Sequence, residues 1–154
     1  MKKTLCLLAV AGGLVTLGAP AYAQFNKPED AIRYRQSAFV LMGNNFGRIN
    51  AQLKSGSPDL QVIQSSAALV EVMSKLPYEA FIPGSETGGT PPTRAKPEVF
   101  KDTDKIKSLA EKMQGEVAKL NTVAKAGDIA AIRAQFGEAG KACKACHDDY
   151  RKDL

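Results

Sequence analysis

Apolar side chains between residues 28 and 53 recur with the spacing of an amphipathic helix. They follow one another at intervals of seven, three or four residues: Ile32, Phe39, Met42, Phe46, Ile49 and Leu53. Residues at these intervals lie on one face of a helix. The basic residues fall mostly between them and are expected on the solvent side: Arg33, Arg35, Arg48 and Lys54. The pattern predicts a first helix with one face in a core.

A second helix is predicted from Pro58 to about Leu76. Ser57 is expected to be its N-cap, since serine before a proline at the first helical position is a common helix start. Pro77 is expected to end it, because proline cannot continue a helix. Its apolar stripe is Leu60, Ile63, Ala67, Val70, Met73 and Leu76.

Two more helices are predicted toward the C-terminus. One begins at Asp102 or Thr103 and carries the stripe Ile106, Leu109, Met113, Val117, Leu120 and Val123. Gly127 and Asp128 are expected to connect the third and fourth helices directly. The glycine follows the end of the third helix, and the aspartate is the N-cap of the fourth. The last helix runs from Ile129 nearly to the end.

A long irregular segment separates the second and third helices. It spans residues 77–102, and its density of proline and glycine excludes a regular helix. Apolar residues at its two ends are expected to pack, with a mobile middle near residues 85–93. Four amphipathic helices, two short connections and one long loop predict an all-α, up-down-up-down antiparallel four-helix bundle.

The motif that bears most on function is Cys143-Lys144-Ala145-Cys146-His147. Cys-x-x-Cys-His is the attachment signature of a c-type haem, with two thiols bound to the porphyrin and the imidazole bound to iron. Both cysteines fall on the apolar stripe of the last helix, so a porphyrin would lie within the bundle with one edge near solvent. The alternatives are a redox dithiol and half of a zinc site.

The N-terminus carries a separate signal. Lys2 and Lys3 precede an apolar run from Leu5 to Ala19 and a small-x-small site that ends at Ala23. This pattern predicts a cleaved signal peptide over residues 1–23, export to the periplasm, a mature domain over 24–154 and no remaining membrane anchor. The formal net charge of +5 is too small and too evenly spread for nucleic-acid binding.

The chain has a single histidine, so two histidines cannot share one iron atom. The sixth coordination position is then a methionine, another weak ligand, water or nothing. The methionines after the predicted cleavage site are Met42, Met73 and Met113. Methionine ligation favours electron transfer by a low-spin haem, whereas a vacant position allows a small gas to bind. Composition does not choose between these outcomes.

Three segments in order resemble one known family. They are Tyr-Arg-Gln-Ser-Ala-Phe over residues 34–39, Ala-Gly-Asp over 126–128, and Cys-Lys-Ala-Cys-His-Asp-Asp-Tyr-Arg over 143–151. This set closely resembles cytochrome c′ over essentially the whole predicted mature chain. The resemblance implies the same four-helix bundle, one covalently attached haem c, and a five-coordinate, high-spin iron.

The resemblance also implies residue roles. Cys143 and Cys146 form the thioethers, and His147 is the axial iron ligand. Phe39 covers the distal face of the haem. Four further residues are expected near the porphyrin, its propionates or the proximal histidine: Arg35, Gln36, Arg94 and Arg151. Family members often have an acid at the loop position of Arg94, so this chain departs from the pattern there.

The function expected from the resemblance is gas binding or electron transfer rather than enzymatic catalysis. Nitric oxide, and carbon monoxide with it, are the expected ligands, the redox partner is unknown, and a homodimer through the first two helices is expected. The alternative is a dedicated electron carrier with Met42 as the sixth ligand, since Met42 lies one turn after Phe39.

Overall fold

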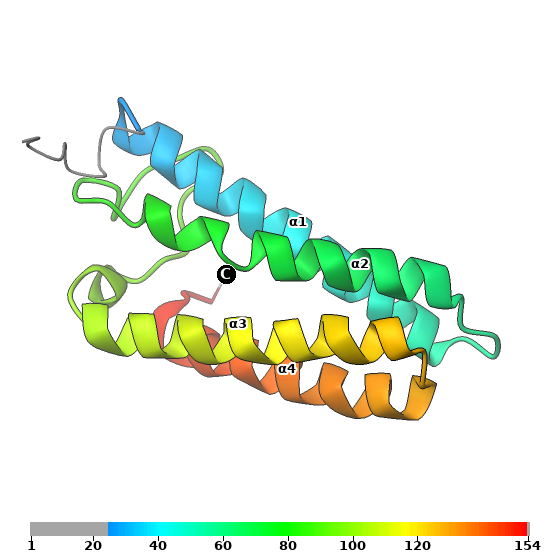
Figure 1. Cartoon of the computed structure of the whole chain (residues 1–154). Helices are drawn as coiled ribbons and strands as arrows, with labels where there is room; N and C mark the ends of the chain where they lie inside the picture. The colour runs from blue at the N-terminus through cyan, green and yellow to red at the C-terminus, as the bar shows by residue number, and fades with distance from the viewer. Residues whose placement is uncertain (1–24, 154) are drawn as a thin grey trace, which may run out of the picture.

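The computed structural model describes residues 25–153, and it confirms the predicted four-helix bundle. The helices are α1 (Pro28–Lys54), α2 (Leu60–Met73), α3 (Thr103–Ala126) and α4 (Ile129–Tyr150). Successive helices run antiparallel, and α1 with α2 forms one layer over α3 with α4 (Figure 1). The predicted signal peptide lies outside the described residues. Within residues 25–153, no helix is long and apolar enough to cross a membrane.

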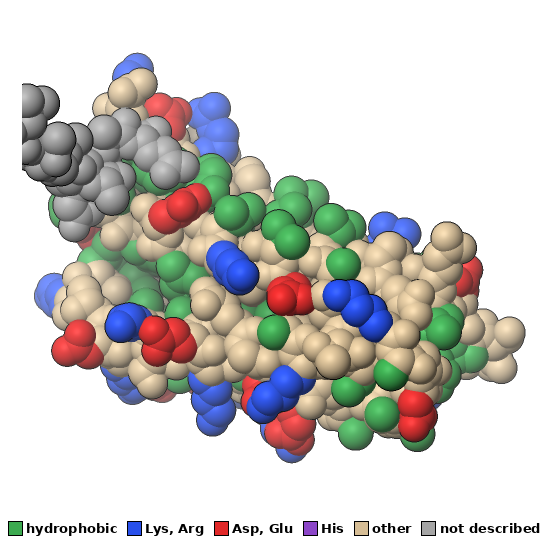
Figure 2. Space-filling model, viewed as in Figure 1, with side chains coloured by type: hydrophobic (Ala, Val, Ile, Leu, Met, Phe, Trp, Pro, Cys, Tyr) green, Lys and Arg blue, Asp and Glu red, His purple; other side chains and the backbone are tan. Residues whose placement is uncertain are grey.

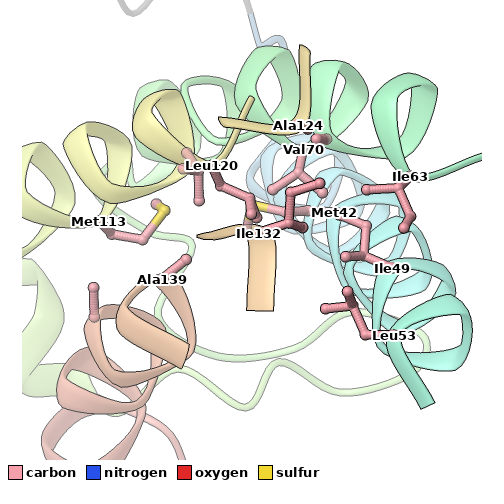
Figure 3. Close-up of a cluster of buried hydrophobic side chains, with 13 residues drawn as sticks. Met42, Ile49, Leu53, Ile63, Val70, Met113, Leu120, Ala124, Ile132 and Ala139 are labelled. Atoms are coloured by element: carbon pink, nitrogen blue, oxygen red, sulfur yellow. The ribbon is translucent and has the colours of Figure 1, made fainter. Parts of the chain in front are cut away.

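The core joins all four helices, as the apolar stripes predicted. Its fully buried members include Ile49 from α1, Ile63 from α2, Leu120 from α3 and Ile132 from α4 (Figure 3). Each buried aliphatic side chain of this size contributes about 1.5–3 kcal/mol relative to exposure. Mutual burial of the four stripes therefore supplies the main stabilisation of the bundle.

The helix ends agree with the prediction at one connection and differ at another. Asp128 caps α4 by accepting hydrogen bonds from the backbone of Ala130 and Ala131, and Gly127 adopts a left-handed φ of +84°. The predicted start of α2 is wrong, because Asp59 is the N-cap and its carboxylate accepts hydrogen bonds from the backbone N–H groups of Gln61 and Val62. A carboxylate that satisfies two orphan donors outweighs the local preference of Pro58 for a first helical position.

The end of α2 also differs from the prediction. The helix ends at Met73, and the chain then tightens into a 3₁₀ turn, η2 (Leu76–Ala80), which contains Pro77 in its first turn. A second 3₁₀ turn, η3 (Pro97–Phe100), precedes α3. Between these turns the crossover loop, residues 81–96, passes over the end of the bundle (Figure 1).

The crossover loop packs closely on α1. Gly89 has a φ of +86°, and a Cβ atom built on it would lie 2.6 Å from Cγ2 of Ile32. Only glycine permits both that backbone conformation and that approach. The loop also reaches the C-terminal end of α4, where Ala95 forms an isolated antiparallel bridge with Arg151. The loop therefore contacts the first and the last helix.

Candidate cofactor-attachment site

The attachment motif occupies the last turns of α4, with all three of its functional side chains half-buried. Cys143 packs against the main core, and neither cysteine forms a disulfide. Cys146 packs against a second cluster, whose buried members are Val99, Ile106 and Tyr150. The structure thus brings together the thiols and the imidazole that the motif requires, at the border of two apolar clusters.

A cavity of about 360 Å³ is lined in part by the second cluster, against which Cys146 packs. The second cluster supplies much of its lining, with side chains from η2, η3 and α3: Tyr78, Phe81, Val99, Phe100 and Ile106. Figure 2 shows hydrophobic side chains in a hollow at the end of the bundle, near the start of α3. Cofactor pockets in proteins are mostly apolar and aromatic and have volumes of about 300–1,000 Å³. A flat macrocycle suits this lining.

The protonation of the thiols argues against a redox dithiol. Burial raises the pKa of Cys143, and a charge on Cys146 raises it further. Burial and the Asp149 carboxylate raise the pKa of Cys146. Redox-active Cys-x-x-Cys pairs need a lowered thiol pKa. Over residues 25–153, no group of three or more histidine, cysteine or acidic side chains is arranged to hold a metal ion, as the zinc alternative would require.

His147 is held as a neutral imidazole. Burial lowers its pKa, and the nearby cations Arg151 and Arg94 lower it further, against the opposing charge of Asp148. The neutral imidazole is the form that coordinates iron. The structure therefore places Arg151, predicted beside His147, and Arg94, predicted as a contact of the crossover loop, close enough to His147 to act on its charge.

Tyr78 belongs to the site, although the sequence analysis did not single it out. It packs against both apolar clusters, and burial followed by the charges of Cys146 and Cys143 raises its pKa. Tyr78 therefore lines the cavity and also lies close enough to both attachment thiols to feel their charge. The available signal was an aromatic residue directly after Pro77, at the point where the second helix was expected to end.

Arg35 is buried, and its expected place on the solvent side is wrong. Its Nη1 donates to the Ala80 carbonyl (3.0 Å) and to Ser85 Oγ (2.7 Å). Its Nη2 donates to the Ser85 carbonyl and to Thr93 Oγ1 (3.2 Å). These acceptors match the four Nη hydrogens, so only Nε–H is left for another partner such as a propionate. Ser85 and Thr93, at the two edges of the segment expected to be mobile, are buried, whereas the residues between them are mostly exposed.

The guanidinium of Arg35 also connects α1 to the cavity wall. It lies 5.0 Å from the ring centroid of Phe81 and 5.5 Å from that of Phe100, and both rings line the cavity. Burial lowers the pKa of Arg35 to about 10, and Glu86 opposes the shift. Arg35 remains charged at neutral pH. Its cation–π contacts join Phe81, at the start of the crossover loop, to Phe100, which follows the loop in η3.

The other predicted α1 residues lie close to Arg35. Gln36 donates from Nε2 to the Pro91 carbonyl (2.9 Å), so it too contacts the crossover loop. Phe39 is half-buried and packs against the same core cluster as Cys143. Met42 is buried within that cluster beside Val70 and Ile132 (Figure 3). Methionine commonly fills such gaps in a core.

Arg94 lies at the C-terminal side of the site. Its Nε and Nη2 donate to the Lys152 carbonyl, at 3.1 Å and 2.9 Å. Arg151 is exposed, and its backbone N–H donates to the His147 carbonyl (3.0 Å). The structure thus gives Arg94 a contact with the chain that follows α4.

Comparisons with known proteins agree with the resemblance seen in the sequence. A family model described as cytochrome c′ matches residues 30–151. The cytochrome c′ of Rubrivivax gelatinosus is 47% identical over 130 residues, which are 84% of this chain and 99% of that protein.

Solved structures of cytochromes c′ share the fold. The nitric oxide complex of a leucine-to-alanine variant from Alcaligenes xylosoxidans has 42% identity and a TM-score of 0.77, and the match covers 85% of this chain and 100% of that chain. A carbon monoxide complex of a leucine-to-glycine variant from the same organism has 42% identity, a TM-score of 0.76 and coverage of 84% and 100%. A cytochrome c′ with ligand-controlled dimer dissociation has 29% identity, a TM-score of 0.79 and coverage of 84% and 99%.

Replacing Arg35 with methionine should destabilise the protein strongly. The substitution keeps an apolar stem but leaves the buried Ala80 and Ser85 carbonyls without their donor, at an expected cost of about 3 kcal/mol in the free energy of unfolding. Urea denaturation of Arg35→Met measures this loss. Arg33→Met, at an exposed position two residues earlier, is the matched control and should change stability by less than about 0.5 kcal/mol. Equal effects of the two substitutions would show that Arg35 does not anchor the loop.

Proposed function

Because the chain belongs to the cytochrome c′ family, we propose that it is a haem protein that binds nitric oxide and carbon monoxide at a five-coordinate iron. The family's cofactor is one covalently attached haem c. The observation that carries the proposal is the arrangement of the only histidine of the sequence and two free thiols on the last turns of α4, where Cys146 packs against the cluster that lines the cavity. This arrangement supports gas binding and electron transfer as the functions of the site.

The attachment residues have distinct tasks. Cys143 and Cys146 would hold the porphyrin by thioether bonds, and His147 would bind the iron through its neutral imidazole. A bound haem would supply an iron atom that accepts small diatomic gases or an electron. Tyr78, Phe81 and Phe100, which line the cavity, would pack against the porphyrin and keep water from it.

The distal side is left without a protein ligand in this proposal. The sequence contains no second histidine, and Met42 is buried among aliphatic side chains of the core. Phe39 covers this side, where its ring excludes large or polar ligands and offers no hydrogen bond. Bound oxygen gains from a polar donor, so such a side disfavours it relative to nitric oxide and carbon monoxide. The gas complexes of the Alcaligenes xylosoxidans variants support this ligand class.

The proximal side has a role of its own. With haem bound, nitric oxide would be able to displace His147, and Arg151 lies close enough to influence that histidine. Electron transfer is the second candidate function, because the half-buried attachment residues place one edge of the cofactor near solvent. The alternative is a low-spin electron carrier in which Met42 would be the sixth ligand and would leave no open position for a gas.

Export is part of the proposal. Residues 1–23 act as a cleaved signal peptide, and residues 24–154 form the mature periplasmic protein, with no membrane anchor left. The basis is the positive start, the apolar run and the small-x-small site of the sequence. Covalent attachment of haem to Cys-x-x-Cys-His is compatible with an exported chain whose two remaining cysteines are both in the motif.

A second copy of the chain is the proposed macromolecular partner. Four large hydrophobic side chains of α1 and α2 are exposed: Val40, Leu41, Leu69 and Val72. Figure 2 shows hydrophobic side chains gathered along the face formed by these two helices. Exposed apolar patches of this kind mark association sites. The similar cytochrome c′ with ligand-controlled dimer dissociation supports a dimer through this face.

Absorption spectra test the proposed coordination. The purified ferric and ferrous protein should show the Soret shape of a five-coordinate, high-spin c-type haem, and nitric oxide should change the ferrous spectrum. Met42→Ala should leave the ferric spectrum unchanged, because Met42 serves as core packing. A methionine–iron charge-transfer band that disappears in Met42→Ala would instead establish the electron-carrier alternative.

Replacing Phe39 with alanine should raise carbon monoxide affinity by roughly tenfold, or about 1.4 kcal/mol, because it removes the ring from the distal side. Titration of the ferrous protein measures the dissociation constant. Phe46→Ala is the matched control: Phe46 lies two turns further along α1 and stacks on Phe136 at 4.1 Å. It should lower stability without changing carbon monoxide affinity. An unchanged affinity in Phe39→Ala would remove Phe39 from the gating role.

The double substitution Val40→Glu and Val72→Glu should shift the protein toward monomers. In a dimer through the α1–α2 face, it would place negative charges of both copies in the interface, where they repel each other. Sedimentation over a range of protein concentrations measures the association constant. Thr122→Glu, on the exposed side of α3, adds charge away from this surface and should leave association unchanged. A wild-type protein that sediments as a monomer at all concentrations would contradict the proposed dimer.

A further inference from the structure

The chain segments around Arg94 and Lys152 form a small hydrogen-bonded unit, which we call the C-terminal clasp. It pairs residues 94–96 of the crossover loop with residues 150–152, antiparallel to each other. The Lys96 amide donates to the Tyr150 carbonyl (2.9 Å), and the Lys152 amide donates to the Arg94 carbonyl (2.8 Å). The clasp begins three residues after His147.

Two side chains of the loop reinforce this pairing. The Arg94 guanidinium places two donors on the Lys152 carbonyl, at 3.1 Å and 2.9 Å. Lys96 Nζ donates to the Asp149 carbonyl (3.0 Å). The last carbonyls of a helix lack partners within the helix. Lys96 therefore caps the end of α4, and Arg94 secures the extended chain directly after it.

The clasp depends on the residue type at position 94. The resemblance to cytochrome c′ leads one to expect an acid there, which has no donor for the Lys152 carbonyl. The arginine of this chain has a planar fork that places two parallel N–H groups on one carbonyl. Because its Nε and Nη2 both donate to the Lys152 carbonyl, Arg94 binds the chain after α4.

We propose that Arg94 is a positioning residue that holds the end of α4 against the crossover loop and so restrains the release of His147. This inference rests on the proposed function, in which nitric oxide displaces His147. With haem bound, that step would break the bond between the imidazole nitrogen and iron, and the imidazole would leave as a neutral group with its lone pair while nitric oxide kept its bond to iron. Movement of the turn that carries His147 would favour this release, and the clasp opposes that movement.

The experiment uses the haem-loaded full-length protein and three variants. Arg94→Ala removes both the charge and the fork, Arg94→Lys keeps the charge without the fork, and Arg48→Ala removes an exposed arginine on α1. Hydrogen–deuterium exchange is measured in peptides that contain Lys96 and Lys152. The rate of formation of the histidine-free nitrosyl form is measured by absorption after mixing the ferrous protein with nitric oxide.

Arg94→Ala and Arg94→Lys should each raise exchange at both clasp amides by about tenfold, the effect of losing one charge-assisted hydrogen bond. Both should speed the loss of His147 by a similar factor, and Arg48→Ala should change neither rate. An Arg94→Lys protein that behaves like the wild type would overturn the proposal, because charge alone would then explain the effect of Arg94. Unchanged rates in Arg94→Ala would overturn it as well.

The two readouts separate this inference from the function on which it rests. A wild-type protein that binds no nitric oxide contradicts the proposed function. It also contradicts the part of this inference that concerns release of His147. Exchange at Lys96 and Lys152 still decides in that case whether Arg94 holds the end of α4. A wild-type protein that binds nitric oxide, with Arg94 variants that keep wild-type rates, overturns the clasp alone.

Discussion

The buried guanidinium of Arg35 is the interaction on which the cavity end of the bundle depends. A buried charge is costly unless it is fully hydrogen-bonded, and a broken network leaves both the charge and its acceptors unpaired. Arg35 meets this requirement with acceptors from Ala80, Ser85 and Thr93, so its burial imposes one conformation on the loop between them. The aromatic rings that it contacts form part of the cavity wall. One side chain of α1 thus determines where the lining from η2 and η3 lies.

The local parts of this structure could be predicted from sequence, whereas the contacts of Arg35 could not. The stripe from Ile32 to Leu53 and the restart at Asp128 depend on residues within a few turns of one another, and both predictions were confirmed. Arg35 lies three residues after Ile32 and four before Phe39, so helical spacing places it on the apolar stripe, and only its charge favoured the solvent side. Its acceptors lie 45 to 58 residues away, in a segment without periodicity. Helical patterning carries no information on such long-range polar contacts.

The same division holds for the attachment site. The Cys-x-x-Cys-His spacing predicted that Cys143, Cys146 and His147 lie together, because a helix brings these positions onto neighbouring parts of its surface. The spacing gave no indication of Tyr78, which reaches the thiols from η2 after α2 ends early at Met73. The start of α2 was also misplaced, because the reach of the Asp59 carboxylate to two amides competes with the preference of Pro58. Tertiary packing and capping geometry decide these details.

The crossover loop gives the two sides of the cofactor site a common support. At Ser85 and Thr93 it accepts hydrogen bonds from Arg35, one turn before Phe39. At its end it pairs with residues 150–152, directly after the turn of α4 that carries His147. Gly89, between Ser85 and Thr93, packs against Ile32, where no larger residue has room. A short segment fixed at both ends cannot move at one end without strain at the other. Under the proposed displacement of His147, a movement at the end of α4 is therefore expected to reach the aromatic wall and α1 through this loop.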